Sequence, residues 1–168
     1  MVEQTQLSAG LPARKFLFVS RQALLPDLAW TLAREGNDVK FHIRNKADKD
    51  VGDGFVEKVE SWEEHLPWAD VVVFDDCDFG GAAEKLRRDG KAVVGGTLYS
   101  DRLEMDREFG QQELKAAGMT ILPSWDFDTF DDALRFVREN PNRYVVKPNG
   151  KAQNEKVLSF IGQEEDGR

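Results

Sequence analysis

The first part of the chain alternates short apolar runs with amphipathic segments. The run KFLFVS at residues 15–20 is followed by leucines and alanines at helical spacing up to Gly36, and a second apolar run occupies residues 39–43. Apolar positions three and four apart indicate a helix, whereas short continuous runs indicate buried strands. The pattern therefore predicts a strand, a helix and a second strand that lies parallel to the first.

The same alternation continues through the next fifty residues. The run ADVVVF at residues 69–74 is typical of a strand covered on both faces, and we expect it to be the most buried strand of the sheet. A short helix is predicted at residues 81–88 and a further strand at residues 91–94. Repeated alternation of strands and helices predicts a Rossmann-like α/β domain over residues 15–98. Residues 1–14 are polar and without period, which predicts a disordered tail.

The pattern changes in the last seventy residues. Two helices and then two strands are predicted, at residues 101–118, 129–141, 143–147 and 156–161. Thr129 with Asp132 is expected to cap the second helix, and the two strands are expected to form an antiparallel hairpin with a long connection. Two helices and one hairpin are too little for a complete domain. Residues 99–168 are therefore predicted to be the start of a second domain that continues beyond them.

Composition narrows the classes of function. A net charge of -8 argues against nucleic-acid binding, which needs clustered Lys and Arg, and no apolar run approaches the roughly 20 residues of a membrane span. Cys77 is the only cysteine, so no internal disulfide can form, and without a secretory signal the expected compartment is the cytoplasm. His42 and His65 have no partner at ligand spacing, so no zinc site is predicted. The expected partners are small molecules.

The first turn between a strand and a helix is the usual place for a phosphate-binding loop. A dinucleotide site requires G-x-G-x-x-G there, but this chain has SRQALLP at residues 20–26. The sequence therefore argues against NAD and FAD. Ser20 and Arg21 remain candidates for binding a small anion of a substrate, through a hydroxyl and a guanidinium. The alternative is that both belong to a solvated turn.

A second polar cluster, DDCDFGG, follows the apolar run at residues 69–74. Ligands of open α/β sheets bind beyond the carboxyl ends of the strands, so Asp76 is a candidate substrate-binding residue. Asp78 can equally serve as the N-cap of the following helix. Both interpretations of this cluster remain open.

A third group of residues carries a resemblance to a known family. Gly-Gly-Thr at residues 95–97 is followed by LEMDREF at residues 103–109, an Ala-Gly break and then YVVKPNG at residues 144–150. This order resembles the ATP-grasp ligases, and within them it is most similar to phosphoribosylamine–glycine ligase. The resemblance covers roughly residues 15–162, and its specific part is residues 94–150.

The resemblance implies a fold, an activity and a set of cofactor contacts. The implied fold is a Rossmann-like pre-ATP-grasp parallel sheet followed by the start of an ATP-grasp domain. Such ligases hold ATP between two sheets and transfer its γ-phosphoryl group to a carboxylate, and an amine then displaces the phosphate. By resemblance, Arg107 and Lys147 contact the phosphates of ATP, and Gly150 and Gln153 belong to a loop that closes over them.

The resemblance also implies what lies outside these 168 residues. Mg²⁺ is the expected second cofactor, and its ligands and the adenine contacts are expected beyond residue 168. The 168 residues alone are therefore expected to be inactive, as the front part of a longer ligase. By resemblance, Ser20, Arg21 and Asp76 lie in the regions that bind the substrate in this family.

Two departures from the family bear on the substrate. The family has Gly-Gly-Arg-Glu-His where this chain has Arg21-Gln22-Ala23, and its Pro-Glu-x-Pro-Leu stretch is replaced by residues 76–81. The implied substrates are glycine and phosphoribosylamine, in purine biosynthesis. The alternatives are another ATP-grasp amide or peptide ligase and a non-catalytic Rossmann-like binding module. Magnesium-dependent ATP hydrolysis that requires a carboxylate would separate the ligases from the module.

Overall fold

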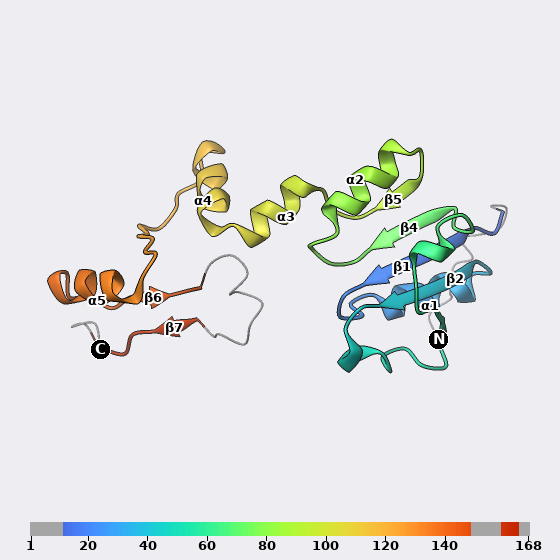
Figure 1. Ribbon diagram of the computed structural model, residues 1–168, viewed down its shortest axis with the longest axis horizontal. Helices are drawn as coiled ribbons and strands as arrows, with labels where there is room; N and C mark the ends of the chain where they lie inside the picture. Colours follow the sequence, from blue (N-terminus) through green and yellow to red (C-terminus); the bar gives the residue numbers. More distant parts are fainter. Residues whose placement is uncertain (1–11, 149–158, 165–168) are drawn as a thin grey trace, which may run out of the picture. The chain divides into compact units, whose positions relative to one another are not determined.

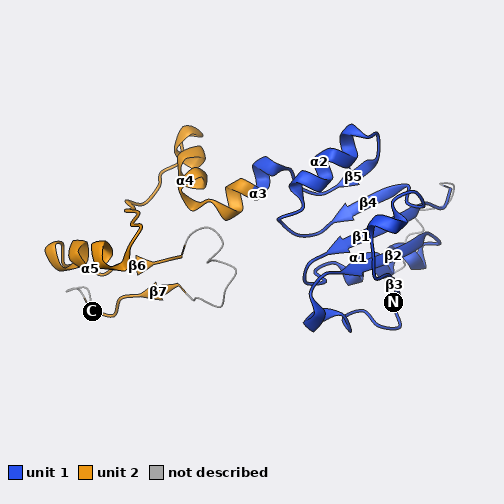
Figure 2. Ribbon diagram, in the orientation of Figure 1, with its two compact units in different colours: residues 1–101 blue, residues 102–168 orange. Residues whose placement is uncertain are grey.

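The computed structural model describes residues 12–148 and 159–164 (Figure 1). The chain divides into two compact units, residues 1–101 and residues 102–168 (Figure 2). The boundary lies three residues beyond the one expected from the sequence, inside a helix that begins at Leu98. The expected tail, residues 1–14, is described only from residue 12, and there the backbone N–H of Arg14 donates a hydrogen bond of 3.0 Å to Asn37.

The first unit is a parallel sheet with helices on both faces. Its strands are β1 (Lys15–Ser20), β2 (Asp38–Ile43), β3 (Glu57–Lys58), β4 (Val71–Phe74) and β5 (Ala92–Val94). Its helices are α1 (Pro26–Arg34) and α2 (Gly80–Arg88), and two 3-10 turns lie at η1 (Lys46–Asp48) and η2 (Glu63–His65). The strand order is β3-β2-β1-β4-β5, and each neighbouring pair is parallel. The predicted α/β alternation is confirmed.

The alternation of side chains along β1 explains why its sequence is continuously apolar. Leu17 and Val19 pack in a cluster with Ala83 of α2, whereas Phe18 packs in a second cluster with Ala29 of α1. Successive side chains of a strand point to opposite faces of the sheet, and here each face is covered by a helix. Both sets of positions must therefore be apolar.

The prediction that residues 69–74 form the most buried strand was wrong. That strand is β4, which has β5 at its outer side, whereas β1 lies in the centre of the sheet between β2 and β4. Four consecutive residues of β1, from Leu17 to Ser20, are fully buried. An apolar run shows that a strand is covered on both faces, but it does not show which strands pair on either side of it.

The second unit contains the later elements. They are α4 (Arg107–Ala116), α5 (Phe130–Glu139), β6 (Val145–Val146) and β7 (Phe160–Ile161), and α3 (Leu98–Met105) crosses the boundary from the first unit. The antiparallel pairing of β6 with β7 confirms the predicted hairpin. Thr129 accepts a hydrogen bond of 3.2 Å from the N–H of Asp132 and donates one of 2.7 Å to its side chain, so the predicted cap of α5 is also confirmed.

The single helix predicted at residues 101–118 is wrong, because the structure has two helices there. The break lies at Asp106, whose backbone is extended (φ -112, ψ 95) and whose carboxylate accepts a hydrogen bond of 3.0 Å from the N–H of Phe109. Aspartate is among the best N-cap residues because it satisfies a backbone donor that the helix leaves without a partner. Apolar spacing alone did not reveal this cap.

Candidate functional site

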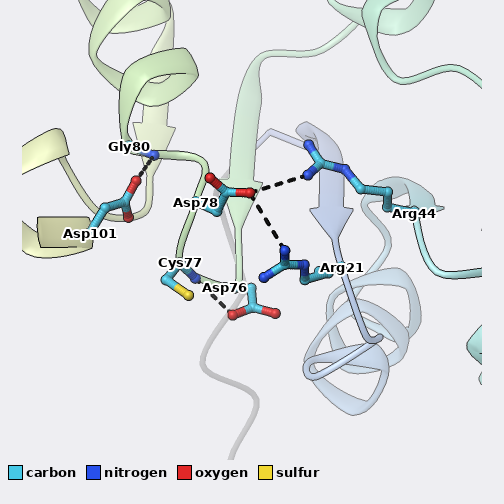
Figure 3. Close-up of polar contacts among 7 residues, drawn as sticks. All are labelled: Arg21, Arg44, Asp76, Cys77, Asp78, Gly80 and Asp101. Atoms are coloured by element: carbon cyan, nitrogen blue, oxygen red, sulfur yellow. Dashed lines mark hydrogen bonds and ion pairs between the residues drawn. The ribbon is translucent and has the colours of Figure 1, made fainter. Parts of the chain in front are cut away.

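The carboxyl ends of three neighbouring strands bring polar loops together in the first unit. Residues 21–25 follow β1, which ends at Ser20, Arg44 follows β2, and residues 75–79 follow β4. Because all strands are parallel, these loops meet at one edge of the sheet, as Figure 3 shows for five of their residues. This edge is where open α/β sheets usually bind ligands.

Ser20 forms the first turn at this edge. Its side chain is fully buried, and its hydroxyl oxygen accepts hydrogen bonds of 2.7 Å from the N–H of Ala23 and 3.4 Å from that of Leu24. Ala23 has a positive φ of 56°, a conformation that usually favours glycine. Ser20 therefore holds a compact turn, and its contact with a substrate remains a prediction.

Asp75 is a partly buried carboxyl at the start of the DDCDFGG cluster, from which the sequence analysis chose Asp76 as the substrate-binding candidate. One of its oxygens accepts a hydrogen bond of 3.2 Å from the N–H of Leu25, which ties the β1–α1 turn to the end of β4. Burial raises the pKa of Asp75, although hydrogen bonds from Ser20 and Leu25 oppose the change. Its position directly after the apolar strand was the available signal.

The raised pKa predicts how Asp75 affects stability. A carboxyl whose folded-state pKa lies above its unfolded value contributes stability that is fully present below the unfolded pKa and is lost as pH rises through the folded pKa. We expect the stability of the wild type relative to the Asp75→Asn variant to fall as pH rises from the unfolded-state pKa of Asp75 to its folded-state pKa. Urea unfolding of both proteins from pH 4 to pH 8 measures this difference. A difference that grows with pH would contradict the assigned direction of the pKa.

Asp78 lies between two arginines from the other loops (Figure 3). Its Oδ2 is 3.7 Å from Nη2 of Arg21 and 3.6 Å from Nη1 of Arg44. The guanidinium of Arg44 also lies over the ring of Phe79, 4.6 Å from its centroid. Arg44 was missed by sequence analysis, since a single arginine after a strand gives no signal until the neighbouring loops are known.

The interpretation of Asp78 as a helix cap is wrong. The N-cap position of α2 is Phe79, with no side-chain cap, and the N–H of Gly80 donates a hydrogen bond of 2.7 Å to Asp101. Asp76 lies on the same loop as Asp78, and its own carboxylate accepts a hydrogen bond of 2.8 Å from the N–H of Cys77. Figure 3 shows Asp76 on the side of Arg21. Arg21 and Asp76, both candidates from the sequence, thus lie at one edge.

The second unit brings together the two candidates for ATP. Arg107 is the first residue of α4, and Lys147 is exposed directly after β6. Nη2 of Arg107 lies 3.4 Å from the carbonyl oxygen of Pro148, the residue next to Lys147. The start of α4 therefore contacts the strand end that carries Lys147. The other two candidates, Gly150 and Gln153, lie outside the described residues.

The described residues contain neither a cluster of metal ligands nor a helix suited to a membrane. Within residues 12–148 and 159–164, no three side chains of His, Cys, Asp or Glu are grouped so that they could hold a metal ion. Over the same residues, none of the helices has the length and apolar character needed to cross a membrane.

Comparison with known proteins shows the fold. No protein-family model matches the sequence, and a search of curated proteins gives no match. The structure is similar to N5-carboxyaminoimidazole ribonucleotide synthetase from Thermotoga maritima, with a TM-score of 0.60 and 15% identity over 90% of this chain and 42% of that one. It is also similar to N5-carboxyaminoimidazole synthetase from Staphylococcus aureus complexed with ADP, with a TM-score of 0.59 and 15% identity over 83% and 40% of the two chains.

The chain thus spans about two fifths of the length of these solved structures. At 15% identity the similarity concerns the fold alone. It agrees with the parallel sheet β3-β2-β1-β4-β5 and the elements that follow it. The chain therefore has the α/β fold class expected from its sequence, with a five-stranded parallel sheet followed by further helices and an antiparallel hairpin, and it shares this fold with the two synthetases.

Proposed function

We propose that this chain is the N-terminal part of an ATP-dependent carboxylate–amine ligase that acts through an acyl phosphate. The observation that carries the proposal is the contact between Arg107 and Pro148, which places a helix cation beside the strand end that bears Lys147. ATP-grasp ligases use two cations from such elements on one polyphosphate. The likeness of fold to a synthetase complexed with ADP supports the same proposal.

The proposed chemistry assigns a separate task to each cation. A carboxylate oxygen attacks the γ-phosphorus of ATP, the bond to the bridging oxygen breaks, and ADP leaves. Arg107 can bind two phosphate oxygens with its planar guanidinium, whereas Lys147 acts as a compact positive charge. Both stabilise the negative charge that moves onto ADP. Bound Mg²⁺ would neutralise further phosphate charge. The amine then attacks the acyl carbon and inorganic phosphate leaves.

The proposed substrates are glycine as the carboxylate and phosphoribosylamine as the amine. Arg21 and Asp76 at the carboxyl edge of the first unit support a substrate that carries both an anionic group and hydroxyls. A second candidate is a ligase for a different carboxylate and amine, and it is favoured by the two solved structures, which are named for a different product. Both candidates keep the same acyl-phosphate chemistry.

An isotope-transfer experiment tests the proposal in the whole protein. With ATP, Mg²⁺, phosphoribosylamine and glycine labelled with ¹⁸O in its carboxylate, we expect one labelled oxygen to appear in inorganic phosphate, because the acyl phosphate passes its bridging oxygen to phosphate. Mass spectrometry of the released phosphate measures the transfer. Unlabelled phosphate formed at the same rate without a carboxylate would contradict the ligase proposal.

The same assay separates the alternatives. If label is transferred only from another carboxylate, or only in the presence of another amine, the proposed substrates are wrong but the protein is still a ligase. A whole protein that neither hydrolyses ATP nor transfers label would instead support the non-catalytic binding module.

A further inference from the structure

The carboxyl edge of the sheet holds two arginines whose backbones are fixed next to each other. The N–H of Arg44 donates a hydrogen bond of 2.9 Å to the carbonyl of Ser20, and the N–H of Asn45 donates one of 3.0 Å to the carbonyl of Arg21. The pairing of β1 with β2 thus continues past the last residue of each strand. Because Phe79 is buried and Arg44 stacks over its ring, one guanidinium is further held in place. We call Arg21 and Arg44 the two-arginine site.

The carboxylate of Asp78 occupies the space between these guanidiniums without binding either tightly. Its Oδ2 lies 3.7 Å from Arg21 and 3.6 Å from Arg44, which is too far for a hydrogen bond to either. The side chain of Asp78 is 56% exposed, and partly exposed ion pairs contribute little to stability. The guanidinium donors therefore remain available for a ligand with more oxygens.

The start of α2 does not depend on the side chain of Asp78. The φ of Asp78 is 72°, in the left-handed region, where aspartate and asparagine are more common than other non-glycine residues. No side-chain cap of α2 depends on it, since Asp101 binds the N–H of Gly80. The loop can therefore move Asp78 away without losing the start of α2.

We propose that the two-arginine site binds the phosphate group of a phosphomonoester, and that Asp78 competes for the same place in the unliganded chain. A phosphate carries up to two negative charges and three acceptor oxygens, so it can accept hydrogen bonds from both guanidiniums where one carboxylate oxygen accepts none. Asp76, on the same loop as Asp78, can accept hydrogen bonds from hydroxyls of the attached sugar. This inference deepens the proposed function, because it assigns the phosphate of a phosphoribosyl substrate to Arg21 and Arg44.

Binding of ribose 5-phosphate to the 168-residue chain tests the site, with calorimetry as the measurement. The Asp78→Asn variant removes the competing charge but keeps a residue that tolerates positive φ, so we expect tighter binding, by up to about tenfold. Arg44→Gln removes charge-assisted hydrogen bonds and should weaken binding by about tenfold or more. Arg88→Gln, at an exposed arginine of α2 that pairs only loosely with Glu84 at 3.9 Å, is the matched control and should change nothing.

Three further arms decide the outcome. Inorganic phosphate should compete with ribose 5-phosphate, and ribose without phosphate should not. Thermal unfolding of every variant shows whether a loss of binding reflects a loss of fold. The proposal fails if Asp78→Asn does not tighten binding, if Arg44→Gln binds as well as the wild type, or if no variant binds the ester at all. None of these measurements uses ATP or a carboxylate, so their failure is distinct from a failure of the isotope-transfer test.

Discussion

Replacing Arg107 or Lys147 by alanine in the whole protein is expected to weaken ATP binding about ten- to a hundredfold for each residue. A charge-assisted hydrogen bond contributes about 1.5–3 kcal/mol, and about 1.4 kcal/mol corresponds to a factor of ten in affinity. Lys147 is exposed and Arg107 is partly exposed, and neither belongs to the two buried hydrophobic clusters of the described residues. The free energy of unfolding should therefore change little.

The double variant distinguishes a shared ligand from two independent surface cations. If both residues contact the same polyphosphate, the loss in the double variant should differ from the sum of the single losses by more than about 0.5 kcal/mol, the usual limit for independent sites. Arg138→Ala, at an arginine near the end of α5, provides a control of equal charge change. If the effects are additive and change thermal stability but not ATP affinity, Arg107 and Lys147 do not contact ATP.

Replacing Gly80 by alanine is expected to destabilise the first unit by about 2–4 kcal/mol, through overpacking and the loss of a hydrogen bond to a carboxylate. A Cβ atom at Gly80 would lie 2.3 Å from the backbone carbonyl of Thr97 and 2.6 Å from a carboxylate oxygen of Asp101. The backbone of Thr97 cannot move aside as easily as a flexible side chain could. The same substitution would separate α2 from the turn before α3, because the N–H of Gly80 binds Asp101 at 2.7 Å.

The neighbouring Gly81 provides the matched control. A Cβ atom there would meet only Cδ2 of Leu98, at an ordinary van der Waals distance of 3.5 Å. Gly81→Ala should therefore leave stability unchanged or raise it by up to about 1 kcal/mol, because alanine favours the helix over glycine. Urea unfolding of the two variants beside the wild type gives the comparison. Equal stability of the Gly80→Ala and Gly81→Ala proteins would show that the contact with Thr97 is not tight.

The loop after β4 shows how far residue patterns could define the site. Its position beyond a buried strand correctly indicated that it lies at the carboxyl edge of the sheet, because parallel strands end at the same side of a sheet. The pattern left two interpretations of Asp78, as a helix cap and as a functional residue. The structure excludes the cap, since Phe79 occupies that position, and it shows the pairing with Arg21 and Arg44. These partners come from different loops, so no local pattern could reveal them.

The residue sequence by itself determined the order and type of most elements and the hairpin near the end of the chain. These follow from local chemistry, since apolar spacing, capping residues and glycine act within a few residues of one another. Only the tertiary structure decided that β1 is the central strand, that Asp106 divides one expected helix, and that Arg44 joins Arg21 around Asp78. The physical reason is that strand pairing and ion pairing join segments far apart in the chain, whose proximity depends on the folded whole.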